Sequence, residues 1–156
     1  MIEIVMENGD VITAKLYPEI APKTVENFLK LIDEDFFAGL IFHRVIPGFM
    51  VQGGGYKADM SHKEAASIKG EFSSNGFKND LKHTRGVLSM ARTMIPDSAS
   101  SQFFIMTDDS PHLDGQYAAF GMVTDGMDAV DKIVEQSRDY MDNPHNPQII
   151  KTIRRK

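Results

Sequence analysis

The sequence contains no cysteine and no tryptophan among its 156 residues. Without cysteine it can form no disulfide, thiolate metal site or thiol nucleophile, and such a composition is usual in a reducing compartment. No apolar run approaches the length of a membrane-spanning helix. The N-terminus, MIEIVMENGD, carries acids and lacks both a basic region and a small-residue cleavage site, so it does not resemble a signal peptide. We therefore expect a cytoplasmic protein that does not contact the membrane.

Basic clusters are also scarce, which bears on the kind of partner. The net charge is -5 and the pI is near 5.5, and the only dense basic cluster is the terminal segment 154–156. A nucleic-acid partner is therefore not expected. With 42% apolar and 25% charged residues, the chain has the composition and length of one globular domain. We expect a single domain over residues 1–156 and, since no self-complementary apolar patch can be inferred, a monomer.

The familiar catalytic motifs are missing as well. No serine lies in a G-x-S-x-G elbow, and the histidines form neither an i, i+4 pair nor an H-E-x-x-H motif. A metal hydrolase would have to assemble His43, His83 and His112 in space, although His43 is better explained by a structural hydrogen bond. Residues 53–55 (GGG) lack the lysine and hydroxyl of a phosphate loop and are predicted to form a turn. We expect no metal and no cofactor.

Hydrophobic periodicity predicts a hairpin followed by a helix at the N-terminal end. Asn8-Gly9 separates two β-prone runs, 1–6 and 10–16, and is a strong two-residue turn signal. Pro22 suits a first helical position, and apolar residues follow it with helical spacing at positions 25, 28, 29 and 32. This spacing predicts an amphipathic helix.

The rest of the chain is predicted to be mainly β. Strands are expected on both sides of Pro47-Gly48 and at 86–91, 102–107, 118–123 and 148–153, and one helix is expected from Met127 to Val134. The segment 56–82 is predicted to be mostly loop with a short strand near Ile68. Short strands with two helices fit an antiparallel barrel or sandwich whose open ends the helices cover.

The stretch FHRVIPGFMVQGGG, from Phe42 to Gly55, raises the question of function because it sets Arg44 among residues typical of a core. A cation against apolar walls needs either a buried acid, such as Glu71, or a ligand that meets it. Strand alternation places Met50 and Gln52 on one face, and it pairs Gln102 with Phe104 in the same way. With Phe49 and Leu113 they would form an apolar hollow rimmed by one cation and two amides. The alternative is that the apolar members are simply core residues.

Four sequence blocks, FHRVIPGFMVQGG, GVLSMAR, SSQFFIMT and HLDGQYAAFGMVTDGMDAVDKI, closely resemble the cyclophilins, a family of peptidyl-prolyl cis-trans isomerases. The resemblance spans nearly the whole chain. It implies a mainly β fold, a closed eight-stranded antiparallel barrel with two capping α-helices and the active site on its outer surface. It also implies catalytic roles for Arg44 and Gln52 and substrate contacts for the remaining matching residues: Phe49, Met50, Ala91, the backbone of Arg92, Gln102, Phe104, His112, Leu113 and Tyr117.

The chain departs from the family pattern at three of these positions. His112 stands where tryptophan is common, Tyr117 where histidine is common, and Arg92 where asparagine is common. The family's tryptophan contacts the inhibitor cyclosporin, so the resemblance implies cyclosporin binding of weakened affinity. The change at Arg92 is expected to matter less, because that position is used through its main chain.

The implied reaction explains why nucleophiles and metals are not needed. Rotation about an X-Pro bond breaks no bond, and its barrier of about 18–20 kcal/mol reflects amide resonance alone. The expected partners are X-Pro peptides and unfolded or flexible protein segments, with assistance to protein folding as the role. A peptide-binding module that uses the same groove without turnover is the competing hypothesis, and the metal hydrolase is a weaker third.

Overall fold

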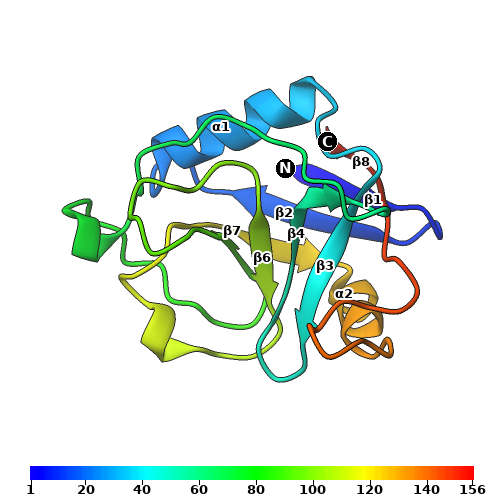
Figure 1. The fold of residues 1–156 in the computed structure, drawn as a ribbon. Coiled ribbons are helices and arrows are strands. Elements are labelled where there is room, and N and C mark those ends of the chain that lie inside the picture. The colour runs from blue at the N-terminus through cyan, green and yellow to red at the C-terminus, as the bar shows by residue number, and fades with distance from the viewer.

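The computed structural model describes all 156 residues and opens with the predicted hairpin (Figure 1). Strands β1 (Ile2–Met6) and β2 (Val11–Leu16) pair in antiparallel fashion. The turn between them has Gly9 at φ +95°, a conformation that costs glycine little. The Asp10 amide donates to Asn8 Oδ1 at 2.8 Å. Local turn chemistry therefore sets this hairpin, as the sequence predicts.

Helix α1 (Pro22–Asp33) has the predicted proline in its first turn, but its N-terminal amides are satisfied from elsewhere in the chain. Ala21, at the N-cap, has no side chain that can cap the helix. Glu71, only 2% exposed, accepts hydrogen bonds at Oε1 from the Thr24 amide (2.6 Å) and the Thr24 hydroxyl (2.7 Å). A loop residue 47 positions away thus caps the helix.

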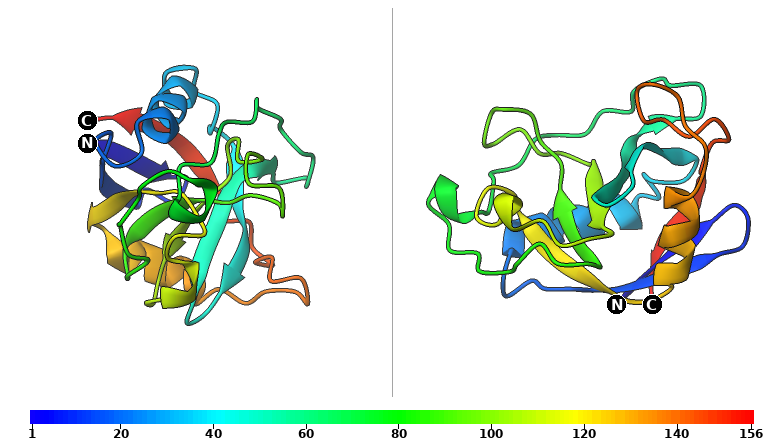
Figure 2. Two further views of the ribbon diagram at one scale, coloured as in Figure 1. Left: turned by 90° about the vertical axis from the view of Figure 1, so that its left-hand side faces the viewer. Right: turned by 90° about the horizontal axis from the view of Figure 1, so that it is seen from below.

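The eight strands form one antiparallel sheet in the order β3-β4-β6-β5-β7-β2-β1-β8. The remaining strands are β3 (Leu40–Ile46), β4 (Met50–Lys57), β5 (Val87–Met90), β6 (Phe103–Met106), β7 (Ala119–Asp125) and β8 (Ile150–Arg155). The two edge strands meet through an isolated bridge between Ile41 and Ile149, which makes the barrel nearly closed. Helices α1 and α2 (Met127–Val134) lie at its opposite ends (Figure 2). The predicted mainly β barrel with two capping helices is confirmed. Neither helix has the length and apolar character needed to cross a lipid bilayer.

Strand alternation divides the apolar residues between two clusters. Phe103 and Ile105 of β6 point into the barrel and join the main core of 31 buried residues, where Phe28 packs edge-on against Phe103 at 5.3 Å. Phe104 and Met106 point to the outside and belong to a separate cluster of six buried residues. An apolar surface outside the barrel is therefore built from the same strands as the core.

Two local predictions are wrong. No strand forms near Ile68, whose amide donates to the Ala99 carbonyl at 2.8 Å. The long connection contains the short 3₁₀ helix η1 (Ser73–Asn75) and an isolated bridge at His62. The glycines at 53–55 are not a turn but lie within β4. A Cβ at Gly53 would be 2.6 Å from the Ile41 carbonyl oxygen. Close approach of a neighbouring strand, rather than chain reversal, therefore requires glycine there.

Candidate active site

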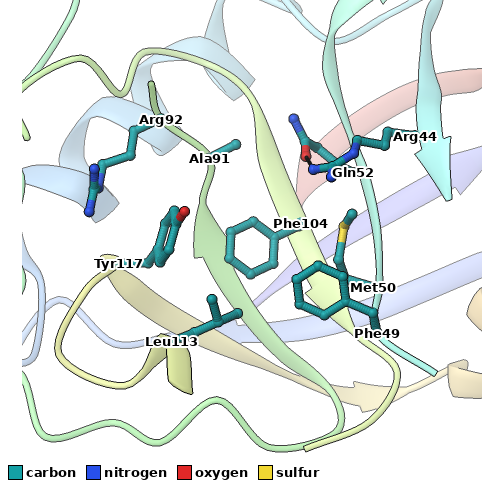
Figure 3. A pocket seen from close by; sticks show the side chains of 9 residues that line it. All are labelled: Arg44, Phe49, Met50, Gln52, Ala91, Arg92, Phe104, Leu113 and Tyr117. Carbon is teal, nitrogen blue, oxygen red and sulfur yellow. Dashed lines mark hydrogen bonds between the residues drawn. The ribbon is translucent and has the colours of Figure 1, made fainter. Parts of the chain in front are cut away.

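A pocket of about 120 Å³ lies on the outer face of β4 and β6, where the outward-facing residues of both strands meet (Figure 3). Gln52 of β4 is paired with Phe104 of β6 in the sheet register, and Met50 lies two residues before Gln52 on the same face. Nine residues line the pocket, all of them predicted site residues: Arg44, Phe49, Met50, Gln52, Ala91, Arg92, Phe104, Leu113 and Tyr117. Residues that strand alternation assigns to one face, from segments distant in the sequence, therefore meet at one surface.

The apolar side of the pocket is formed by buried side chains. Phe104 and Met50 come from the sheet, and Leu113 comes from the 3₁₀ helix η2 (Pro111–Leu113). Tyr117 stands edge-on to Phe104 with ring centroids 5.8 Å apart. Apolar walls around a small hollow favour a compact apolar group such as a pyrrolidine ring.

The polar side is a chain of three side chains that runs from β3 to the start of β6. Arg44 Nη1 donates to Gln52 Oε1 at 3.3 Å, and Gln52 Nε2 donates to Gln102 Oε1 at 3.0 Å. Arg44 is exposed and lines the pocket, so the alternative of a buried ion pair with Glu71 is excluded. Glu71 instead caps α1 through Thr24. The side chain of Arg44 lies on the outward face of β3, whereas its apolar neighbour Val45 lies on the other face of the strand.

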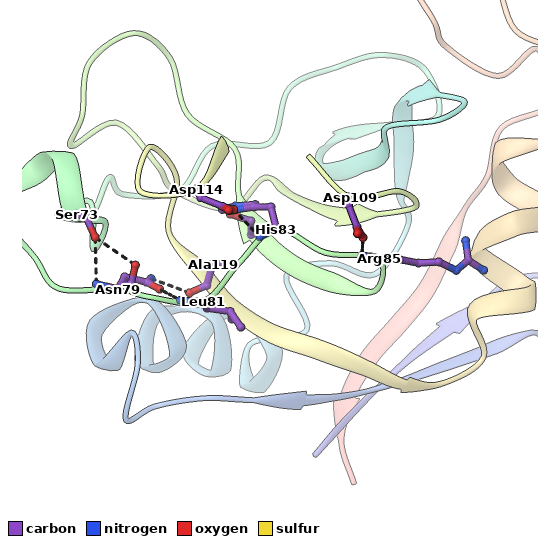
Figure 4. Close-up of polar contacts among 9 residues, drawn as sticks. Ser73, Asn79, Leu81, His83, Arg85, Asp109, Asp114 and Ala119 are labelled. Atoms are coloured by element: carbon purple, nitrogen blue, oxygen red, sulfur yellow. Dashed lines mark hydrogen bonds and ion pairs between the residues drawn. The ribbon is translucent and has the colours of Figure 1, made fainter. Parts of the chain in front are cut away.

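A buried histidine packs against the apolar wall of the pocket, and Figure 4 shows its contact with Asp114. His83, 1% exposed, lies with its ring stacked on Phe104 at 6.1 Å. Its Nδ1 is 3.1 Å from Asp114 Oδ1 and its Nε2 is 2.9 Å from Ser89 Oγ. Because a carboxylate only accepts, Nδ1 carries the proton and Nε2 accepts from the Ser89 hydroxyl. Burial lowers the pKa of His83, and the Asp114 carboxylate opposes this effect.

The sequence gives no signal for His83 as a supporting residue, since it lies in a polar loop segment. Its backbone amide also donates to Asp114 Oδ1 at 2.6 Å, and its carbonyl accepts from the Ser110 amide at 2.9 Å. These bonds fasten both ends of η2, which carries the pocket residue Leu113, to the segment before β5. Tertiary contacts alone reveal this arrangement.

Two predicted site residues do not line the pocket. His112 is exposed at the rim, with its ring 6.1 Å from that of Phe49. Gln102 lines an adjoining polar hollow of about 260 Å³. We call this the second hollow, and its residues are Gln52, His62, Ala91, Arg92, Thr93, Ser98, Ser100 and Gln102. Of these, His62, Thr93, Ser98 and Ser100 are not among the predicted site residues, because they lie in loops without periodicity.

The remaining histidine predictions are not supported by the structure. His43 Nδ1 is buried without a hydrogen-bond partner, so the expected structural hydrogen bond is wrong; the ring packs on Tyr56 with centroids 4.6 Å apart. Burial, together with the nearby Arg44 cation, lowers the pKa of His43 to about 4. No three histidine or carboxylate side chains gather as metal ligands, so the trio of His43, His83 and His112 does not form a site.

Comparison with known proteins agrees with this geometry. Residues 1–155 match the family described as cyclophilin type peptidyl-prolyl cis-trans isomerase. Peptidyl-prolyl cis-trans isomerase B of Escherichia coli K12 is 41% identical over 98% of both chains, and a peptidyl-prolyl cis-trans isomerase of Acinetobacter baylyi is 49% identical over 85% of this chain and 71% of its own.

A solved structure agrees in fold as well as sequence. The crystal structure of a cyclophilin type peptidyl-prolyl cis-trans isomerase from Cryptosporidium parvum, determined in the presence of the dipeptide Ala-Pro, superimposes with a TM-score of 0.84 at 29% identity. The match covers 99% of this chain and 98% of that one. The chain therefore belongs to the cyclophilin-type peptidyl-prolyl cis-trans isomerases and is an enzyme of that family.

Proposed function

We propose that the pocket holds the proline ring of an X-Pro peptide while Arg44 stabilises the twisted amide. The observation that carries this proposal is the position of the Arg44 and Gln52 side chains beside the apolar wall formed by Met50 and Phe104. As the X-Pro bond rotates, amide resonance is lost and the lone pair of the prolyl nitrogen, no longer shared with the carbonyl, becomes able to accept a hydrogen bond. Arg44 offers only donors and stays charged at every relevant pH, so it can donate to that lone pair.

Energetics decide how much Arg44 has to contribute. Acceleration from about 0.01 to about 100 per second is four decades, or about 5–6 kcal/mol. One charge-assisted hydrogen bond supplies about 1.5–3 kcal/mol. The remainder comes from holding the ring in the pocket while the acyl side turns, and from whatever desolvation the bound peptide brings. No covalent intermediate is required, because no bond is broken.

Substitution of Arg44 tests this mechanism. We expect Arg44→Ala to lower kcat/KM on a short X-Pro peptide by about 10²–10³ and to leave the melting temperature nearly unchanged, because the side chain is exposed. Exchange spectroscopy by NMR measures the isomerisation directly, and Arg85→Ala, which removes an arginine paired with Asp131 away from the pocket, is the matched control. A near wild-type rate in Arg44→Ala would refute the proposed role. Peptide binding without faster exchange in the wild type would leave only a binding module.

The substrates are proposed to be exposed X-Pro segments of unfolded or flexible chains. The Cryptosporidium parvum neighbour crystallised in the presence of Ala-Pro supports this class. Assistance to folding is tested by adding the enzyme to a refolding protein whose slow phase is proline-limited. The slow phase should become faster in proportion to enzyme concentration. An unchanged slow phase would restrict the activity to short peptides.

Cyclosporin is proposed to bind with weakened affinity, since His112 replaces an indole at the rim. Losing about 50–80 Å² of apolar contact costs about 1–2 kcal/mol, or tenfold or more in Kd. His112→Trp should therefore tighten cyclosporin binding severalfold in a calorimetric titration, with little change in peptide turnover. Equal cyclosporin affinities of the wild type and His112→Trp would show that residue 112 is not part of the inhibitor site. A monomer acting in the cytoplasm remains our prediction, to be checked by sedimentation and cell fractionation.

A further inference from the structure

The second hollow continues the pocket along the surface. Three residues line both: Gln52, Ala91 and Arg92. On the proposed function, a peptide whose proline fills the pocket brings residues within a few positions of the proline close to the second hollow. All but one of the residues lining the second hollow are polar. The second hollow is therefore suited to a polar side chain of the substrate.

The charged residues that line the pocket and the second hollow are all basic. No aspartate or glutamate lines either the pocket or the second hollow, although the chain as a whole carries a net charge of -5. Arg44 and Arg92 lie on opposite sides of the pocket (Figure 3). The acid beside the lining residue His62 is Glu64, whose Oε1 is 3.9 Å from the ring and whose side chain is 88% exposed. The two hollows thus form a locally cationic surface on an acidic protein.

Arg92 is held in place by its neighbours. Its guanidinium lies over the rings of Phe72 (4.6 Å) and Tyr117 (4.7 Å). Nε and Nη2 donate to the Gln116 carbonyl and Nη1 donates to the Thr93 carbonyl. Of the five N–H groups of a guanidinium, these bonds leave two free for a ligand. Because the side chain is already fixed, little rotamer entropy is lost when a ligand binds.

We propose that Arg92 determines specificity, favouring X-Pro substrates that carry an acidic side chain within a few residues of the proline. The carboxylate would occupy the second hollow near Thr93, whose carbonyl accepts from Arg92 Nη1, so that the guanidinium attracts it, while the Gln102 amide and the Ser100 hydroxyl can donate to it. A pair of unit charges about 6 Å apart, at an effective dielectric constant of about 40–80, corresponds to a preference of about three- to tenfold. This inference depends on the proposed function.

The test compares peptide pairs that differ only by Glu or Gln. Four pairs place the residue two or three positions before or after the proline, and NMR exchange gives kcat/KM for each at pH 7.5. In at least one pair we expect the wild type to prefer Glu by about three- to tenfold at low salt, and the preference to shrink at about 1 M salt because the charges are screened. Arg92→Gln should abolish the preference and Arg92→Lys should retain most of it.

The control is Lys78→Gln, which changes the net charge equally at a side chain 87% exposed and outside both hollows. It should leave the Glu preference intact. Equal rates for Glu and Gln in every wild-type pair, or a preference that survives in Arg92→Gln, would overturn this inference while leaving the isomerase activity established. Absence of catalysis on every peptide would overturn the proposed function, and this inference with it.

Discussion

The substitution Gly55→Ala probes how the polar side of the site is held. Gly55 lies in β4 and its φ is outside the left-handed region, so alanine is not strained by the backbone. A Cβ there would be 2.5 Å from Gln102 Cγ and 2.6 Å from Gln102 Nε2. Real Cβ atoms do not approach so closely, so the Gln102 side chain has to leave its position. Gln52 then loses the acceptor that now holds its Nε2 at 3.0 Å.

The cost follows from that displacement. Overpacking costs about 1–3 kcal/mol, and the lower end applies because the Gln102 side chain is only partly buried and can rotate. Loss of the hydrogen bond between the Gln52 and Gln102 side chains removes a further 0.5–1.5 kcal/mol, roughly, of the free energy that holds Gln52 in place. Gln52 is the residue that orients Arg44. We expect kcat/KM on a neutral X-Pro peptide to fall about two- to tenfold while the fold is retained, as judged by NMR exchange and a thermal melt.

A double-mutant cycle with Gln102→Ala separates this effect from a general disturbance of β4. The Gln102→Ala background lacks the three side-chain atoms nearest to the new methyl group, so Gly55→Ala should change kcat/KM there by less than about twofold. An equal loss in both backgrounds would show that the alanine acts on the strand itself. Full activity of the single variant would show that Gln102 does not help to orient Gln52 and Arg44.

The remaining predictions concern stability and substrate binding. The folded-state pKa of His43, about 4, lies below its ordinary value of 6.5. The free energy of unfolding should therefore decline by about 2–3 kcal/mol as the pH falls from 6.5 to 4. Urea titrations of His43→Phe should show a smaller decline. Glu71→Ala should cost about 1–2 kcal/mol by uncapping Thr24, and Glu71→Gln, which keeps an acceptor, should cost less in calorimetry. His83→Leu removes the ring contact with Asp114 and Ser89 behind Phe104 and should raise KM, whereas an unchanged KM would make His83 purely structural.

The parts of the fold that were predicted correctly depend on local sequence. The hairpin follows from Asn8-Gly9, and α1 follows from Pro22 and the spacing of apolar residues after it. The errors depend on contacts between distant segments. The glycines of β4 look like a turn in the sequence because nothing local reveals that the Ile41 carbonyl and the Gln102 side chain occupy the space of their missing side chains.

In the candidate site, too, some residues could be predicted from local sequence and others depend on contacts between distant segments. The residues on β4 and β6 could be predicted, because alternation fixes which of them share the outer face. The choice between a buried acid and a ligand as the partner of Arg44 could not be made from periodicity, since a sequence does not show that β3 turns this side chain away from the core. The support from His83 and the stacking of Arg92 between Phe72 and Tyr117 could not be predicted, because loops bring these residues together from distant parts of the chain.

The position of the pocket outside the barrel matters for how the enzyme can change. Phe103 fills the core, whereas its neighbour Phe104 lines the pocket and belongs to the separate outer cluster. A substitution at the exposed site residue Arg44 therefore leaves the main core untouched, whereas Arg92 also packs on Phe72 of that core. On the proposed function the reaction needs only a shaped apolar surface and well-placed donors, so we expect that exchanging one cation at the second hollow alters specificity without rebuilding the arrangement of Arg44 and Gln52.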